Sequence, residues 1–260
     1  MVWADARAAL AETDPAAKCR QVDALRASAK HAALGAPDEA PVPAAGRPER
    51  PELVHPSELP RRGLGSAAGR VALLHAVAHI EFNAINLALD AALRFSGLPV
   101  DYYRDWLSVA SDEARHFRLL SDRLAELDAA YGDLPAHNGL WEMADKTAHD
   151  PMVRMALVPR VLEARGLDVT PGMIDRLRQA GDEASVACLE VILDEEVRHV
   201  AIGSTWFRYL CRQRGLPPEA TFRALLDDYF AGGLRGPFNV AARRRAGFSR
   251  TEIEELQRAS

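Results

Sequence analysis

Residues 111–117 read SDEARHF, and residues 194–200 read DEEVRHV. In both stretches a Glu stands three positions before a His, within a sequence that otherwise has the apolar spacing of a buried helix. Side chains three positions apart lie on the same side of a helix, so each stretch would present a carboxylate and an imidazole together. A single pair of this kind arises easily by chance. Two pairs in similar apolar surroundings require a physical reason.

The sequence around these stretches predicts helices and no strands. Ala, Leu and Arg are abundant, and capping residues and helix breakers mark where helices begin and end. No run alternates between apolar and polar residues as a strand does. The chain is therefore expected to be all-α and built around four principal helices. The predicted helices cover 66–94, 100–130, 140–148, 151–167, a short helix from Thr170-Pro171, 182–212 and 219–230, with one or two more in 1–33.

A proline-rich stretch, residues 36–65, separates the first helices from the rest and contains PVP, RPERP and HPSELP. Proline at this density excludes a helix, so the stretch is expected to run extended over a surface. This predicts three parts: an N-terminal helix and wrapping arm (1–65), a four-helix bundle (66–213) and a C-terminal helical extension (214–260).

Four acids lie on helix faces that should point to the core: Glu81, Glu113, Glu163 and Glu196. Around each of them, the positions three, four and seven residues away are mostly apolar. An unpaired ionised carboxylate costs several kcal/mol to bury, and four would exceed the stability of an ordinary domain. Something positively charged must therefore compensate them.

The spacing of the acids indicates what compensates them. Glu113 follows Glu81 by 32 residues and Glu196 follows Glu163 by 33, about one helical hairpin each. Each half thus supplies a single Glu and then a Glu-x-x-His, the ligand pattern of four-helix dinuclear metal proteins. Four carboxylates and two neutral imidazoles also balance two divalent cations. The predicted ligands are Glu81, Glu113, His116, Glu163, Glu196 and His199. A third match, Glu52 with His55, lies in the proline-rich stretch and is discarded.

These residues resemble the ligand series of the ferritin-like di-iron carboxylate superfamily. Within it, almost the whole chain is similar to an uncharacterised ferritin-like family of unknown function, and more distantly, through the Glu-Ala-Arg of 163–165, to the tRNA-modifying di-iron hydroxylases. The resemblance implies a ferritin-like four-helix bundle. The matching stretches are HAVAHIEFNAINLALDAALRF, DYYRDWLSVASDEARHFRLL, YGDLPAHNGLWEMADKT, RMALVPRVLEARGLDVTPGM and LRGPFN.

The resemblance also implies a role for two neighbouring acids. In bacterial multicomponent monooxygenases, which share the motif, the acid before the ligand Glu accepts a hydrogen bond from the metal-bound His of the opposite helix. Asp112 would then orient His199, and Glu195 would orient His116, fixing each imidazole tautomer. The alternative is that both acids are solvated. The metal pair is expected to be iron, with manganese or a mixed Fe/Mn pair as alternatives.

The leading functional hypothesis is a hydroxylase or oxidase that activates dioxygen, acts on a small organic or nucleoside substrate and takes electrons from an external reductase. A ferroxidase or iron store, a rubrerythrin-type peroxidase and a non-enzymatic, metal-stabilised helical interaction protein are alternatives. A homodimer is a further expectation. The net charge of −5 argues against nucleic acid as a partner.

Cysteine usage and hydropathy predict where the chain resides. Cys19, Cys188 and Cys211 lie far apart and form no CxxC, which fits a reducing, cytosolic setting. The N-terminus has no apolar signal region. The apolar runs are interrupted by charged residues well short of the ~20 that a membrane span needs, so the chain is expected to be soluble.

Three local features carry further expectations. Pro159, one turn before Glu163, should kink its helix or open the helical hydrogen bonds. His75 and His79 face away from Glu81 and should belong to a polar, hydrogen-bonded helix face rather than to a separate metal site. The basic tail, residues 235–250, could meet phosphate, but an exposed and solvated surface is favoured.

Overall fold

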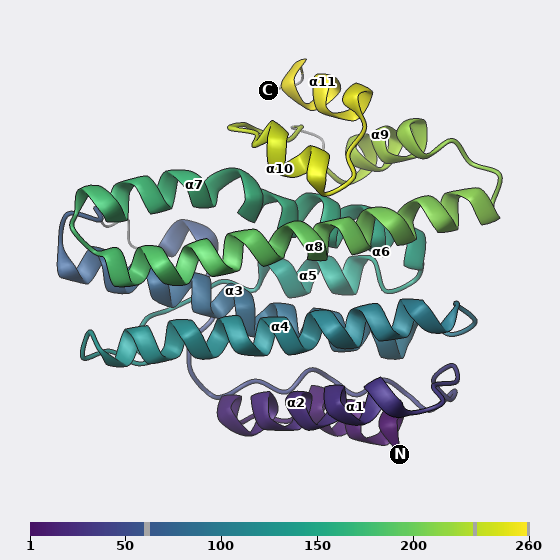
Figure 1. Cartoon of the computed structure of the whole chain (residues 1–260), viewed down its shortest axis with the longest axis horizontal. Helices are drawn as coiled ribbons and strands as arrows, with labels where there is room; N and C mark the ends of the chain where they lie inside the picture. Colours follow the sequence, from purple (N-terminus) through teal and green to yellow (C-terminus); the bar gives the residue numbers. More distant parts are fainter. Residues whose placement is uncertain (60–62, 231–232, 259–260) are drawn as a thin grey trace. The chain divides into compact units, whose positions relative to one another are not determined.

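The computed structural model describes residues 1–59, 63–230 and 233–258, and within them the chain is helical (Figure 1). The all-α prediction is confirmed. The only extended pairing among these residues is an isolated bridge between Leu53 and Ala136. The helices are α1 (Val2–Ala11), α2 (Pro15–His31), the 3₁₀ turn η1 (Pro56–Glu58), α3 (Ala67–Arg94), α4 (Val100–Ala125), α5 (Gly139–Lys146), α6 (Pro151–Leu157), the π-helix η2 (Val158–Glu163), α7 (Ala164–Gln179), α8 (Glu183–Gln213), α9 (Pro218–Tyr229), α10 (Val240–Arg245) and α11 (Arg250–Arg258).

Packing divides the chain into two compact units, which are described separately. The first comprises Met1–Glu142 with Ala180–Cys188, and the second comprises Met143–Gln179 with the chain from Leu189 onward. Helices α5 and α8 each contribute residues to both units. The three-part division at residues 65 and 213 stays a prediction.

The first unit is built on the hairpin of α3 and α4, with α2 packed on α4 and α1 on α3 (Figure 1). Its core is large and aromatic: Phe82 of α3 and Tyr102, Tyr103 and Trp106 of α4 are all at most 1% exposed. Burial of side chains of this size supplies the main stabilisation of such a unit. Glu81 of α3 and Glu113 of α4 therefore lie in an apolar interior.

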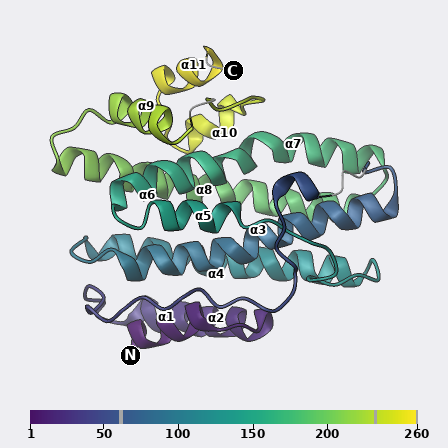
Figure 2. The same ribbon diagram turned by 180° about the vertical axis from the view of Figure 1, so that it is seen from behind.

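Residues 36–59 of the proline-rich arm run largely extended along the first unit, as expected for a stretch with this many prolines (Figure 2). The Gly46 N–H donates to Leu10 O at 2.8 Å, and the Ala136 N–H donates to Glu52 O at 2.9 Å. A Cβ at Gly46 would lie 2.2 Å from the backbone oxygens of Ala11 and Glu12, so only glycine allows this close approach. The arm therefore joins the first helix to the segment after α4.

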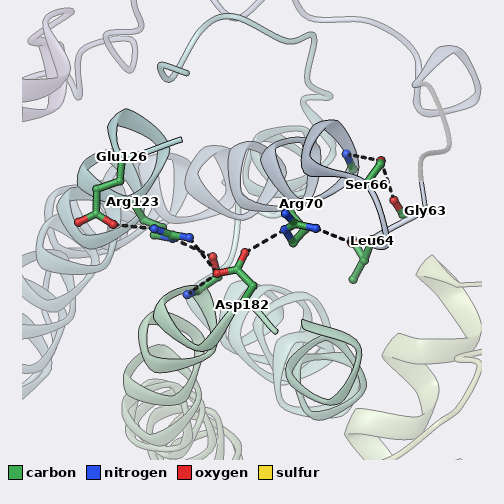
Figure 3. A network of polar contacts seen from close by, with 9 residues as sticks. Gly63, Leu64, Ser66, Arg70, Arg123, Glu126 and Asp182 are labelled. Carbon is green, nitrogen blue, oxygen red and sulfur yellow. Dashed lines mark hydrogen bonds and ion pairs between the residues drawn. The ribbon is translucent and has the colours of Figure 1, made fainter. Parts of the chain in front are cut away.

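Asp182 ties the start of α8 to α3 and α4 (Figure 3). Its carboxylate accepts from the Ser185 N–H at 3.1 Å, which caps α8, and pairs with Arg123 at 2.8 Å and Arg70 at 3.2 Å. Burial acts to raise the pKa of Asp182, but the Ser185 hydrogen bonds and the Arg123 charge hold it below its usual value. This network fixes where α8 enters the first unit.

Two predicted helix limits are wrong, each for a local reason. Helix α4 ends at Ala125 rather than near 130, because Asp128 adopts a φ of 55° and the Ala129 N–H closes the end on Leu124 O. The helix expected to stop at Leu167 instead continues as α7 through Pro171 to Gln179. Proline cannot donate to Leu167 O four residues earlier, but Asn239 Nδ2 does so at 3.2 Å.

Among the described residues, one helix, α3, has the length and hydropathy of a membrane span. Its most apolar 18-residue window is 72% buried inside the protein. Core helices of soluble proteins share these properties, so the burial supports the expectation of a soluble chain. The cytoplasmic location stays a prediction.

Candidate metal centre

In the first unit, the structure brings together Glu81 of α3 with Glu113 and His116 of α4. Their side chains are buried, with at most 5% exposed. His116 Nδ1 lies 3.1 Å from Glu81 Oε2 and 3.3 Å from Glu113 Oε2. Two carboxylates and one imidazole nitrogen therefore converge on one point inside an otherwise apolar hairpin.

The proton affinities of this cluster reflect its confinement. Burial, followed by the nearby Glu113 charge, raises the pKa of Glu81 to about 7. Burial disfavours a charged His116, but its hydrogen bonds to Glu113 and Glu81 and their charges raise its pKa to about 11. A divalent cation between these groups would compete with the proton of His116, because the same two carboxylates favour both.

In the second unit, Glu163 is the last residue of η2, and Glu196 and His199 lie on α8. Glu163 is 9% exposed, Glu196 is 8% exposed and His199 is fully buried. His199 Nδ1 lies 3.1 Å from Glu196 Oε1, which repeats the carboxylate–imidazole contact of the first unit. As in the first unit, acids occupy buried positions beside a histidine Nδ1.

The π-helix bears out the expectation for Pro159. Residues Val158–Glu163 form wider turns than an α-helix, with Pro159 in the first of them. Helix α8 approaches this segment closely at Gly203, where a Cβ would lie 2.3 Å from Pro159 Cγ. Single π-turns inside α-helices often mark functional sites. The wider turns therefore give the Glu163 side chain a direction that differs from the one it would have in a regular α-helix.

Four of the six predicted ligands form a buried group that could hold a metal ion. Each residue offers one ligand atom, and these four atoms lie within 4.8 Å of one another. Carboxylate oxygens and imidazole nitrogen suit iron and manganese, and the donor chemistry fits such ions. The group does not contain Glu163 or His199. Its members are Glu81, Glu113, His116 and Glu196.

The two acids that precede the predicted ligands Glu113 and Glu196, namely Asp112 and Glu195, are half-buried. Arg115 lies 3.7 Å from Asp112 within the same helix. The predicted hydrogen bonds from these acids to His199 and His116 stay predictions.

The histidines on the other face of α3 form a hydrogen-bonded face, as predicted. His79 Nδ1 lies 2.9 Å from the Tyr131 hydroxyl, and the Gly132 N–H donates to His75 Nε2 at 2.9 Å. Burial lowers the pKa of His79 to about 4, so this imidazole stays neutral. Tyr131 stacks on both rings. These contacts place both histidines in a hydrogen-bonded helix face.

Sequence reasoning missed several buried basic side chains, of which Lys18 and Arg160 are two examples. Lys18 of α2 is fully buried and donates to Leu10 O at 2.8 Å and to Asn86 Oδ1 at 2.5 Å. Arg160 of η2 is 2% exposed and pairs with Glu252. Arg160 falls close to the apolar helix face of Glu163, which indicated that it could be buried. The helix pattern alone cannot identify its partner Glu252, which lies 92 residues away in the sequence.

A comparison with known proteins now gives the chain a family. Residues 11–254 match a family described as a protein of unknown function (DUF455). The chain belongs to this family. It is similar to an uncharacterized protein of Haemophilus influenzae, with 48% identity over 214 residues that cover 80% of this chain and 74% of the relative. No solved structure matches the chain.

Proposed function

We propose that the protein is a di-iron carboxylate oxidoreductase that activates dioxygen to hydroxylate or oxidise a small organic or nucleoside substrate. The observation that carries the proposal is the buried group of three carboxylates and one imidazole, which could hold a metal ion. The repeated motif extends it, because each unit supplies a single Glu and a Glu-x-x-His.

The energetic argument favours a pair of cations over side-chain compensation. Even after relaxation, a buried ionised carboxylate carries a penalty of several kcal/mol. His116 can neutralise one charge in the first unit, but two carboxylates meet it there. Two divalent ions held by four carboxylates and two neutral imidazoles leave no net charge. Glu163 and His199 would complete this set in a ferritin-like arrangement of α3, α4, the α6–η2–α7 rod and α8.

Each residue has a distinct role in this proposal. Bound iron would supply the electrons for dioxygen reduction, which none of these side chains can do. His116 and His199 would offer Nδ1, the atom that already faces a carboxylate in each unit. Asp112 and Glu195 would fix the imidazole tautomers. Glu163, the last residue of the π-helix, would be the fourth carboxylate of the set.

Oxygen consumption by the iron-loaded, chemically reduced protein tests the proposal. We expect uptake that requires iron, is lost in Glu113→Ala and increases with a suitable organic or nucleoside substrate. No uptake above that of free iron would contradict it and would favour a metal-stabilised interaction protein. Uptake that stores ferric iron, together with cage-sized particles in light scattering, would indicate a ferroxidase instead.

A further inference from the structure

The second unit contains a cavity that the metal-site proposal does not use. It has a volume of about 200 Å³ and is bounded by η2, α7, α10 and the loop before α10. Its apolar walls come from η2 and from the segment between α9 and α10. They are formed by Val161, Leu162, Phe230, Leu234 and Phe238. A cavity of this size accommodates a small organic molecule with a ring or short chain.

The charged lining of the cavity is strongly biased to one sign. Three arginines line it, Arg165, Arg235 and Arg243, and Asp168 is its one acid among the described residues. Asp168 is already neutralised, because Arg243 donates to both of its carboxylate oxygens at 2.9 and 2.7 Å. The cavity therefore keeps two uncompensated guanidinium groups beside apolar walls.

The cationic wall is held in place by hydrogen bonds. Arg165 Nη1 donates to Arg235 O at 2.8 Å and to Pro237 O at 3.2 Å, which fixes the loop of the LRGPFN stretch on α7. The Asn239 N–H donates to Asp168 Oδ1 at 2.9 Å. Arg165 still has guanidinium N–H groups beyond Nη1 for a ligand. A rigid arrangement of this kind lowers the entropic penalty of binding.

A buried arginine corrects the expectation for the basic tail. Arg243 is 1% exposed, although the tail was expected to be a solvated surface, and its Nη1 is buried without a hydrogen-bond partner. Arg244 and Arg245 are exposed, as expected. Guanidinium groups recognise carboxylate and phosphate through paired N–H donors, and three such groups line this cavity.

We infer that this cavity binds the oxyanion of a small organic molecule, either a carboxylate or a phosphate monoester, with the apolar body of the ligand against Leu162, Leu234 and Phe238. Arg235 and Arg165 contact the oxyanion, while Arg243 and Asp168 form the fixed back wall. Val161 and Leu162 belong to the π-helix that ends at Glu163, so the ligand lies against the segment that carries a predicted metal ligand. The inference does not require the metal centre.

Calorimetric titration of the full-length protein at low ionic strength tests the inference with three probes: phenyl phosphate, benzoate and inorganic phosphate. We expect saturable binding of phenyl phosphate or benzoate with a Kd of about 1 mM or tighter. The tighter of the two identifies which oxyanion the cavity prefers. Inorganic phosphate should bind more weakly, because it makes no contact with the apolar walls.

Variants connect the binding to the cavity. Arg235→Gln removes an exposed guanidinium group, so the variant should fold normally. Its affinity for the preferred probe should fall by about tenfold or more. Arg245→Gln, an exposed arginine on α10 that pairs with Asp194 outside the cavity, is the matched control and should bind normally. No saturable binding to the wild type, or equal affinity in wild type and Arg235→Gln, would overturn the inference.

Discussion

The two halves of the candidate centre use the same residue types but are built differently. Glu81, Glu113 and His116 lie on regular helices whose local periodicity alone turns them inward. Glu163 lies at the end of a π-helix, whose backbone is shaped by Pro159. The regular half can be read from the sequence nearby, whereas the geometry of the irregular half depends on residues far along the chain.

The irregular half is anchored by a buried arginine. The Arg160 guanidinium carbon lies 4.7 Å from the ring centroid of Phe207, 4.1 Å from that of Phe222 and 4.6 Å from that of Phe248, and its Nη2 donates to Glu252. Cation–π contacts of this kind are strongest where water is excluded. Helices α8, α9 and α11 thus all hold the segment that ends at Glu163.

The largest effect is expected from breaking this anchor. Arg160→Met leaves Glu252 buried without its cation and should lower the free energy of unfolding by about 3–5 kcal/mol. Urea denaturation measures this loss, and circular dichroism checks the fold. Arg250→Gln, which removes an exposed pair with Glu254 on the same helix, is the control and should leave the unfolding free energy nearly unchanged.

The comparison between the halves predicts which half of the candidate centre loses metal affinity in Arg160→Met. Arg160→Met should weaken metal binding through Glu163 while Glu81, Glu113 and His116 keep their geometry. Full stability in the variant would show that the contacts of Arg160 with the three phenylalanine rings and Glu252 do not hold the π-helix.

The contrast explains how far the sequence could predict the structure. The limits of α3 and α8 and the burial of the four carboxylates follow from local spacing, so these features were predictable. Helix α7 was not, because it continues through Pro171 only with help from Asn239, 72 residues away from Leu167. The Arg160–Glu252 pair likewise depends on a contact that no local pattern contains.

A smaller effect is expected where α8 meets the π-helix. Gly203→Ala places a methyl group against the Pro159 ring, which cannot move away without shifting the backbone. Such overpacking should lower the free energy of unfolding by about 1–3 kcal/mol. Gly172→Ala is the matched control, because a Cβ there meets nothing within 4 Å, and it should raise stability by about 0.5–1 kcal/mol. Stabilisation by both variants in thermal denaturation would contradict the close approach.

The smallest effect for each pH unit is a pH dependence of the free energy of unfolding, which arises from Lys18 of α2 in the first unit. Burial lowers the pKa of Lys18 to about 7 from an unfolded value of about 10.4, so between these values the unfolded chain binds one more proton. Stability should therefore rise with pH in this window, by at most about 1.4 kcal/mol per pH unit. Below about pH 7 both states are protonated and the slope disappears. Urea denaturation at a series of pH values measures this rise, which Lys18→Met should lack. The same change of unfolding free energy with pH in the wild type and in Lys18→Met would contradict the prediction.

Metal content measured on protein purified under iron-replete conditions tests most directly whether cations compensate the buried acids. We expect about two metal ions per chain in the wild type and a loss of most of them in Glu113→Ala. Glu52→Ala, in the third Glu-x-x-His of the sequence, is the control and should keep the full content. A wild type without bound metal, or an unchanged content in Glu113→Ala, would contradict the account.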